Sequence, residues 1–295
     1  MTQQKINFNF LPYYDSDDIA NSIKSALNIP RPIASDLGQS ALNAAQQGYY
    51  FDEDEVKIDW HQLVQAAFAN KKSIAPTDAL PIAQPIIHTE TRVQVANETT
   101  FIAAHRMIES GLRPLALNFA NGVTPGGGFL SGARAQEEVL CRSSALYWTL
   151  LGDPMYHAHR QRQQPDSTDW AIYSPDVPVF RLDNGTTLSQ PWLLNILTCA
   201  APYAPRIGKQ QSAKLLRQRI HRVLSIAQAY GYSSLVLGAW GCGAFGNDPQ
   251  QTAIDFRQTL ENDFSDAFSD IVFAITDWSP ERKFLGPFNS VFSEQ

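Results

Sequence analysis

The sequence predicts an α/β protein, a sandwich with a mixed, largely parallel sheet and an N-terminal helical extension. Two observations support this. Beyond about residue 85, short apolar runs typical of strands alternate with amphipathic runs typical of helices, which is the pattern of a layered α/β fold. With 295 residues, 44% hydrophobic and 18% charged, the chain can also bury a substantial core. We expect residues 1–85 to form a helical accessory region packed on a main domain of residues 86–295.

Three helices are expected in the N-terminal region. The first begins with the acidic residues Asp17 and Asp18, which suit the positive end of a helix dipole. An acidic stretch at 52–55 is expected to be a solvated loop, and the proline-containing stretch 74–85 is expected to be a linker. The three predicted helices cover residues 16–28, 37–47 and 59–72.

The main domain is predicted to alternate strands and helices to its end. Gly111 is expected to end the first helix, and the turn at 183–185 to connect a hairpin. The predicted strands are residues 91–97, 114–121, 233–240 and 270–277, with the hairpin over 177–200. The predicted helices are residues 98–111, 136–151, 209–231 and 248–262.

Two glycine clusters each follow a predicted strand. Glycine-rich turns offer free backbone N–H groups to a diphosphate, and ligands of open α/β sheets bind at the carboxyl ends of strands. The second cluster matches the G-x-G-x-x-G dinucleotide pattern, but only one predicted strand follows it, which disfavours a dehydrogenase. If their strands are parallel, the two clusters would face one crevice and could hold one pyrophosphate. They are Gly126, Gly127 and Gly128, and Gly241, Gly243 and Gly246.

Two adjacent acids, Glu137 and Glu138, lie in the first turn of the helix after the first glycine cluster. Acids at this position can simply complement the helix dipole. Here, however, two asparagines, Asn118 and Asn121, lie at the end of the preceding strand. Amide and carboxyl groups bind sugar hydroxyls, and a carboxyl group can protonate a leaving alcohol. The combination predicts a nucleotide sugar with a scissile glycosidic bond as the ligand.

The run GGG, seven residues, QEE resembles the signature of the poly(ADP-ribose) glycohydrolases, in which six to eight residues separate the two triplets. "NFAN" before it and "GAWGCGAFGN" downstream resemble the family's ribose-contacting and diphosphate-binding segments. The resemblance is to the compact bacterial type and extends from about residue 90 onward. It implies a macrodomain-like three-layer α/β/α sandwich that hydrolyses ribose–ribose O-glycosidic bonds and releases ADP-ribose.

The resemblance also implies roles for the residues around the scissile bond. Glu138 would be the catalytic acid/base, and Glu137 and Asn121 would hold the distal ribose, with Gln136 as a further substrate-binding residue. Adjacent residues on a helix point about 100° apart, so the two glutamates cannot share one role. This favours one acid/base and one positioning group.

For the rest of the ligand, the two glycine clusters would form two diphosphate loops. Phe245, at the tip of the second loop, would pack over the distal ribose and diphosphate. Phe288 is expected to stack on the adenine, with Phe284 as the neighbouring candidate.

Two other functions remain open from the sequence. One is the removal of single ADP-ribose units from modified protein or nucleic acid, which needs a similar pocket. The other is a non-catalytic ADP-ribose-binding module, which needs the glycine loops but no acid at the sugar. The presence of both Glu137 and Glu138 favours an enzyme. The expected partners are poly(ADP-ribose) or ADP-ribosylated macromolecules, and the net charge of −6 argues against a broad basic face for nucleic acid.

We expect a cytoplasmic protein that needs no cofactor or metal. The N-terminus does not resemble a secretory signal, and the sequence has no apolar run long enough to span a membrane. Three cysteines, Cys141, Cys199 and Cys242, lack CxxC spacing, which favours reduced thiols. His157 and His159 have no partners at metal-ligand spacing and are expected to be exposed.

Overall fold

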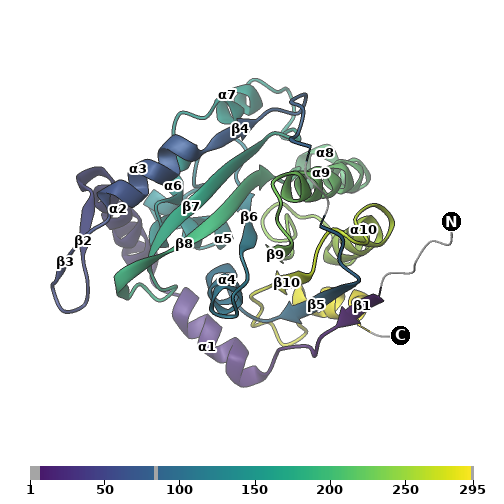
Figure 1. Cartoon of the computed structure of the whole chain (residues 1–295), viewed down its shortest axis with the longest axis horizontal. Coiled ribbons are helices and arrows are strands. Elements are labelled where there is room, and N and C mark those ends of the chain that lie inside the picture. The colour runs from purple at the N-terminus through teal and green to yellow at the C-terminus, as the bar shows by residue number, and fades with distance from the viewer. Residues whose placement is uncertain (1–6, 83–85, 294–295) are drawn as a thin grey trace.

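The computed structural model describes residues 7–82 and 86–293 and places one large sheet between two groups of helices (Figure 1). Neighbouring strands from β1 to β8 run parallel, β7 is antiparallel to β8, and β4 is antiparallel to β7. The predicted mixed, largely parallel sheet is confirmed. In spatial order its strands are β1 (Asn7–Phe10), β5 (Glu90–Ala96), β10 (Asp270–Ala274), β9 (Ser234–Leu237), β6 (Pro114–Ala120), β8 (Thr187–Ala200), β7 (Ala171–Arg181) and β4 (Lys72–Ile74).

Helices cover both faces of this sheet, and β2 (Tyr49–Phe51) and β3 (Lys57–Asp59) form a separate two-stranded ribbon. One face carries α2 (Arg31–Gln47), α3 (His61–Asn70), α4 (Thr100–Glu109), α5 (Gln136–Ser143), α6 (Leu146–Leu150) and α7 (Pro154–Arg160). The other carries α9 (Lys209–Ala229), α10 (Pro249–Asp263) and α11 (Leu285–Val291). The remaining helices are α1 (Asp17–Leu27), α8 (Ala204–Ile207) and the 3₁₀ turn η1 (Phe129–Ser131).

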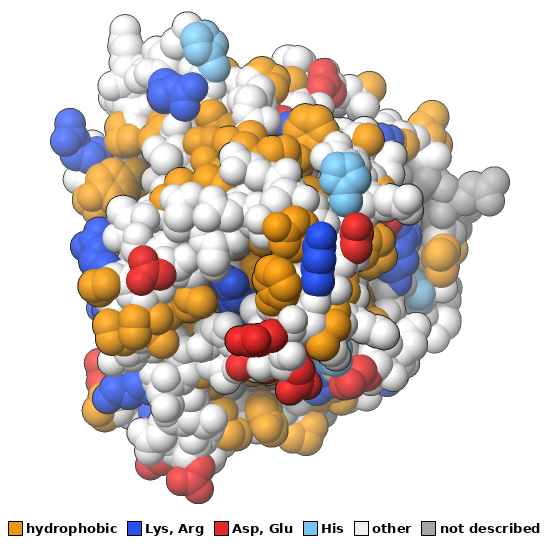
Figure 2. All heavy atoms as spheres, turned by 90° about the vertical axis from the view of Figure 1, so that its left-hand side faces the viewer, with side chains coloured by type: hydrophobic (Ala, Val, Ile, Leu, Met, Phe, Trp, Pro, Cys, Tyr) orange, Lys and Arg blue, Asp and Glu red, His pale blue; other side chains and the backbone are white. Residues whose placement is uncertain are grey.

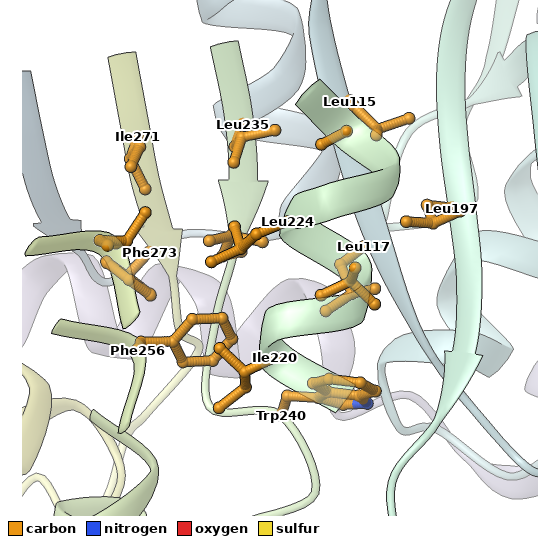
Figure 3. Close-up of a cluster of buried hydrophobic side chains, with 14 of the residues drawn as sticks. Leu115, Leu117, Leu197, Ile220, Leu224, Leu235, Trp240, Phe256, Ile271 and Phe273 are labelled. Atoms are coloured by element: carbon orange, nitrogen blue, oxygen red, sulfur yellow. The ribbon is translucent and has the colours of Figure 1, made fainter. Parts of the chain in front are cut away.

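Successive residues of the central strands belong to different cores, as expected for a sheet buried on both faces. Leu235 and Leu237 pack toward α9 and α10, whereas Val236 between them packs toward α4. Figure 3 shows the first of these cores, in which Ile220 and Leu224 of α9 and Phe256 of α10 face the strands. This alternation produces the three layers that the family resemblance implied.

The N-terminal region is part of the main sheet. Strand β1 pairs in parallel with β5, and β4 pairs with β7, so both edge strands come from before residue 85. Helix α2 also packs on α5 and η1, where Arg31 Nε donates to the Ser131 carbonyl over 2.8 Å. The described residues on both sides of the expected division at residue 85 therefore share one sheet and pack on one another. The sequence analysis predicted helices here and no strands.

The predicted helices, hairpin and strand–helix series form, but some of their bounds differ. Helix α2 begins at Arg31 instead of residue 37, and β7 begins at Ala171 instead of residue 177. The β2–β3 ribbon and the helices α7, α8 and α11 were not predicted. The helix predicted over 136–151 is interrupted, because Ser144 has extended backbone angles and pairs with Val179 of β7. Among the described residues, no helix is both long and apolar enough to cross a membrane.

Candidate active site

A cavity of about 450 Å³ opens at the carboxyl ends of β5, β6, β9 and β10. This is the edge at which a parallel sheet binds ligands. The loop after β9 contributes Gly241 and Gly243 to the cavity wall, whereas the loop after β6 contributes Asn121, Arg134 and Ala135 but not its glycine cluster. The lining of the cavity includes Asn121, Gln136, Glu137 and Glu138 from one side and Gly241, Gly243, Ala244 and Phe245 from the other.

Gln136 attaches the start of helix α5 to its neighbours. Its Oε1 accepts the Phe119 N–H (2.9 Å), and its Nε2 donates to the Leu117 carbonyl (2.8 Å) and to Thr100 Oγ1 (3.1 Å). These contacts join α5 to β6 and α4. They fix the helix turn that carries the two glutamates, and they occupy the amide that the sequence analysis expected to bind substrate.

Glu137 is held by the end of β6. Its Oε2 accepts the Asn121 N–H (2.7 Å), and Asn118 Nδ2 lies 3.4 Å from its Oε1. The residue is only 3% exposed, and burial, with the nearby Glu138 charge, raises the pKa of Glu137 to about 8. The neutral form is therefore favoured in neutral solution, so the adjacent acids do not carry two full charges.

Glu138 is fixed by the first glycine cluster. Its Oε1 accepts the Gly128 N–H over 3.0 Å, while its Oε2 is buried and has no hydrogen-bond partner among the described residues. The carboxyl group lines the cavity from the first turn of α5. One oxygen is thus held in place and the group retains free hydrogen-bonding capacity, as proton transfer requires.

The first glycine cluster lies against the carboxyl groups. Gly127 has φ +58°, and a Cβ there would lie 2.3 Å from Glu138 Oε1 and 3.1 Å from Glu137 Oε2. Gly126, Gly127 and Gly128 are not among the residues that form the cavity wall. Their expected role as a diphosphate loop stays a prediction; in this structure Gly127 and Gly128 lie against the Glu138 carboxyl group.

The second glycine cluster does face the cavity, through Gly241 and Gly243. Gly241 has φ +75°, and a Cβ there would lie 2.7 Å from the Ala201 side chain. Phe245 is half-buried, lines the cavity and meets Tyr203 edge-on at 5.7 Å between ring centroids. Gly246 is not one of the wall residues, and a Cβ there would lie 3.2 Å from Pro205 Cγ.

The aromatic end of the cavity differs from the prediction. Phe288 is 0% exposed and packs in the core against Phe273 and Phe292, so it cannot stack on a ligand. Its helix, α11, turns this ring toward the sheet together with its other buried residues. Phe284, the neighbouring candidate, is half-buried and lines the cavity.

The cavity wall also includes residues that the sequence analysis did not identify, among them Glu98, Trp278, Leu27 and Arg134. Glu98 and Trp278 follow the ends of β5 and β10, and their position after a strand was the one available signal. Arg134 Nη1 donates to Asn28 Oδ1 and to the Ile29 carbonyl, each over 2.8 Å. The connection between α1 and α2 thereby borders the cavity, which no local pattern indicates.

His159 corrects another expectation. It is buried, not exposed, and its Nδ1 lies 2.9 Å from the Gly122 carbonyl and its Nε2 2.7 Å from Thr168 Oγ1. Burial lowers the pKa of His159 to about 4, so the ring is neutral and supports the loop after β6. Within the described residues, no group of three or more His, Cys, Asp or Glu side chains could hold a metal ion.

Glu137→Gln is expected to remove part of the pH dependence of stability. The raised pKa of Glu137, about 8 against 4.5, means that the folded protein keeps a proton that the unfolded chain releases. Its stabilising contribution is present below about pH 4.5 and is lost as the pH rises through about 8. Wild type should thus lose melting temperature relative to the variant over this window.

Thermal unfolding at several pH values measures this difference. Glu109→Gln is the matched control, because the Glu109 side chain is 68% exposed. Parallel melting curves for wild type and Glu137→Gln across the window would show that Glu137 is not a buried neutral acid.

Comparisons with known proteins agree with this geometry. The family model described as "Microbial-type PARG, catalytic domain" matches residues 38–182. The structure of poly(ADP-ribose) glycohydrolase (PARG) from Thermomonospora curvata is 36% identical, with a TM-score of 0.82, over 88% of this chain and 98% of that one. The structure of the same enzyme bound to the inhibitor ADP-HPD is 35% identical, with a TM-score of 0.80, over 87% of this chain and 98% of that one.

The enzyme from Deinococcus radiodurans in complex with ADP-ribose is 38% identical, with a TM-score of 0.69, over 77% of this chain and 96% of that one. A comparison with curated proteins gave no match. The matched solved structures are covered almost completely, and the signature glutamates lie on the wall of the cavity. The chain therefore belongs to the microbial-type poly(ADP-ribose) glycohydrolase family.

Proposed function

We propose that Glu138 and Glu137 carry out the hydrolysis of poly(ADP-ribose) in this glycosidase. The protein is a poly(ADP-ribose) glycohydrolase, which cleaves ribose–ribose O-glycosidic bonds and releases ADP-ribose. The observation that supports the two roles best is the placement of both acids on one cavity wall, with Gly127 directly against their oxygens.

The cavity has three parts that suit the three parts of ADP-ribose. At one end, Phe284 and Trp278 offer rings for the adenine, and the Glu98 carboxylate can accept from an amino group. The loop with Gly241 and Gly243 offers close backbone approach to a diphosphate. Asn121, Glu137 and Glu138 then meet the distal ribose, and Phe245 lies over it. Gln136 acts by holding helix α5.

Glu138 acts first as an acid and then as a base. As the bond from the anomeric carbon to the 2′-oxygen breaks, its electron pair stays on the oxygen, which takes the proton of Glu138. The ribose passes through an oxocarbenium-like state. Water then attacks the anomeric carbon and gives its proton to the Glu138 carboxylate, which restores the enzyme. Glu137 holds the ribose hydroxyls throughout.

We further propose that the region before residue 85 belongs to the catalytic unit. Its strands β1 and β4 complete the sheet, and the α1–α2 connection borders the cavity through Leu27 and the Arg134 contacts. A cytoplasmic location is also proposed. It is supported by the three cysteines, Cys141, Cys199 and Cys242, which are all buried and free.

Recognition of the polymer is proposed to occur within the cavity. Figure 2 looks onto the side at the left of Figure 1, where α2 and the β2–β3 ribbon lie. Acidic, basic and hydrophobic side chains are interspersed on this face, without a wide basic area. The net charge of −6 also disfavours broad attraction of a polyanion.

Incubation with labelled poly(ADP-ribose), with monomeric ADP-ribose as the readout, tests the function. A second substrate, a protein carrying single ADP-ribose units, tests whether the enzyme also cleaves the bond to an amino acid. Release of ADP-ribose from the polymer is expected. Binding without release from the polymer would contradict the assignment.

Phe284→Ala is expected to weaken ADP-ribose binding, because base–aromatic stacking contributes about 1–3 kcal/mol per base. Phe288→Ala is the matched control, since that ring is fully buried. It should lower stability by about 3–5 kcal/mol, as truncation of core phenylalanines does, with unchanged affinity per folded molecule. Calorimetric titration with ADP-ribose and thermal unfolding of both variants measure the two effects. Loss of affinity in Phe288→Ala alone would reverse the assignment.

A further inference from the structure

The loop between β10 and α11, residues 275–284, forms the aromatic end of the cavity. Its residues Ile275, Thr276, Trp278 and Phe284 all belong to the cavity wall. Apart from turns, this loop has no regular secondary structure. Its shape therefore depends on individual hydrogen bonds and ion pairs, and these decide how firmly the two rings are presented to a ligand.

One set of contacts comes from Asp277, within the loop. Its Oδ2 accepts the Phe284 N–H over 2.6 Å and the Leu285 N–H over 3.2 Å, and its Oδ1 accepts the Ser279 N–H over 2.9 Å. Asp277 is held in turn by Asn97, the residue after β5. Asn97 Oδ1 accepts the Asp277 N–H over 3.0 Å, and Asn97 Nδ2 donates to the Asp277 carbonyl over 2.7 Å. The amide of Asn97 thus fixes the start of the loop.

A second set of contacts comes from Asp15, which lies between β1 and α1. Its Oδ1 accepts from Asn97 Nδ2 over 2.7 Å, and its Oδ2 accepts from Arg282 Nε over 2.8 Å. The Asp15 side chain is 8% exposed and that of Arg282 is 15% exposed, so salt and water screen this ion pair little. In Figure 1 the connection from β1 to α1 and the segment after β10 accordingly run side by side.

Arg282 needs such a contact because of its backbone. It has φ +49°, a left-handed conformation that residues other than glycine adopt rarely and keep only where the surrounding structure holds it. Its Nε donates to Asp15, its Nη1 to the Ser279 carbonyl and its Nη2 to Asp17 Oδ1, each over 2.8 Å. The Asp17 side chain is 94% exposed, and its ion pair adds little. The Asp15 carboxylate is therefore the main charged group outside the loop that holds Arg282.

We infer that Asp15 and Arg282 are positioning residues for adenine recognition: their ion pair attaches the loop that carries Trp278 and Phe284 to the segment before α1. The inference rests on the proposed role of Phe284 at the adenine. A loop that already has its binding conformation needs no ordering when the ligand arrives, which strengthens affinity. Neither Asp15 nor Arg282 is a wall residue, so both act through the loop.

Arg282→Asn is the first test. Asparagine tolerates a left-handed φ better than most residues, so this variant loses the contact with Asp15 more than the backbone conformation. If the loop then keeps its binding conformation in roughly one molecule of ten, the Kd for ADP-ribose and the KM for poly(ADP-ribose) both rise about ten-fold. The kcat should stay within about two-fold of wild type, because loss of uniform binding raises KM alone. Arg282→Lys keeps the charge and should recover part of the affinity.

Asp15→Asn is the second test and changes the other member of the pair. Its amide has one oxygen, which can take the place of Oδ1 toward Asn97 or of Oδ2 toward Arg282 but not of both. We expect the same rise in Kd and KM as in Arg282→Asn, again with kcat retained.

Asp270→Asn is the matched control. The Asp270 side chain is 11% exposed and pairs with Arg92, but this ion pair joins β10 and β5 near their amino ends, away from the cavity. Stability should fall in this variant, and Kd and KM should not change.

A double variant shows whether the ion pair acts through the aromatic loop. In the Phe284→Ala background, Asp15→Asn should raise the Kd for ADP-ribose less than it does in wild type, because residues that act as one unit are not additive. Equal rises in the two backgrounds would mean that Asp15 affects binding by another route, and the inference would fail.

Calorimetric titration with ADP-ribose, steady-state turnover of labelled polymer and thermal unfolding are measured for all variants. Higher Kd and KM with retained kcat in Arg282→Asn and Asp15→Asn, and not in Asp270→Asn, support the positioning role. Wild-type Kd and KM in both variants, or an equal rise in Asp270→Asn, overturn it. If one of the two does not fold, the other decides. Unchanged affinity in Phe284→Ala would instead reject the proposed adenine site itself.

Discussion

Glu138→Gln is expected to lower the turnover of poly(ADP-ribose) by about two to four orders of magnitude, the usual loss when a general acid–base group is removed. Glutamine keeps the size of the side chain and can still accept the Gly128 N–H, which reaches Glu138 Oε1 over 3.0 Å. It has no proton of suitable acidity for the departing 2′-oxygen. Release of ADP-ribose from labelled polymer, measured under single-turnover conditions, gives the chemical step.

Binding separates this loss from a structural one. ADP-ribose should bind Glu138→Gln with nearly wild-type affinity, because the ribose is proposed to be held by Glu137 and Asn121 and the rest of the ligand lies elsewhere in the cavity. Glu137→Gln, one residue earlier, should instead weaken binding as well as turnover. Near-normal turnover in Glu138→Gln would be incompatible with its role as the acid.

The sequence analysis expected the two glycine-rich loops to lie together only if the strands before them were parallel. The strands β6 and β9, which precede the two glycine clusters, are parallel neighbours in the sheet, so the loops that follow them emerge side by side. Local patterns were sufficient to identify both strands and both loops. Glu137 and Glu138 lie beside the first loop because α5, which carries them in its first turn, begins where that loop ends.

The edges of the sheet could not be predicted in the same way. Strands β1 and β4 are four and three residues long, too short for a periodic pattern, and their partners are far away in the sequence. Their pairing depends on tertiary contacts. The same limit applies to Leu27 and Arg134, whose place at the cavity depends on how α1 and α2 pack.

The sequence also did not reveal which aromatic side chain near the C-terminus faces the cavity. Phe284 and Phe288 differ by four residues, a spacing that would place them on one face of a continuous helix. In the structure α11 begins only at Leu285, and the Phe284 N–H is instead bound by Asp277 Oδ2. The two rings therefore separate, one toward the cavity and the other into the core.

Gly127→Ala is expected to lower turnover by about a hundred-fold, because a displacement of roughly 1 Å in a reacting group can have that effect. A methyl group at this position would lie 2.3 Å from Glu138 Oε1, so the carboxyl group must move. Gly127→Val adds further bulk at φ +58°, a backbone conformation that β-branched residues rarely adopt, and should be more severe.

Gly111→Ala separates the clash from the backbone strain. Gly111 has φ +80°, and a Cβ there has nothing within 4 Å, so alanine meets the left-handed penalty of about 1–2 kcal/mol without any clash. Both alanine variants should lose this much stability, and Gly127→Ala should lose more because of the clash, but only Gly127→Ala should lose turnover per folded molecule. Wild-type turnover in Gly127→Ala would show that its close approach to the Glu138 carboxyl group does not matter for the reaction.

The same variant also decides between two roles for the first glycine cluster. If the cluster binds the diphosphate directly, Gly127→Ala should weaken ADP-ribose binding at least as much as it lowers turnover. If it supports the carboxyl groups, as the short distances from Gly127 to Glu138 and Glu137 indicate, the loss should fall mainly on the chemical step. We expect the second result, with turnover reduced far more than affinity, because Gly128 already uses its N–H to hold Glu138 and Gly127 lies against that carboxyl group.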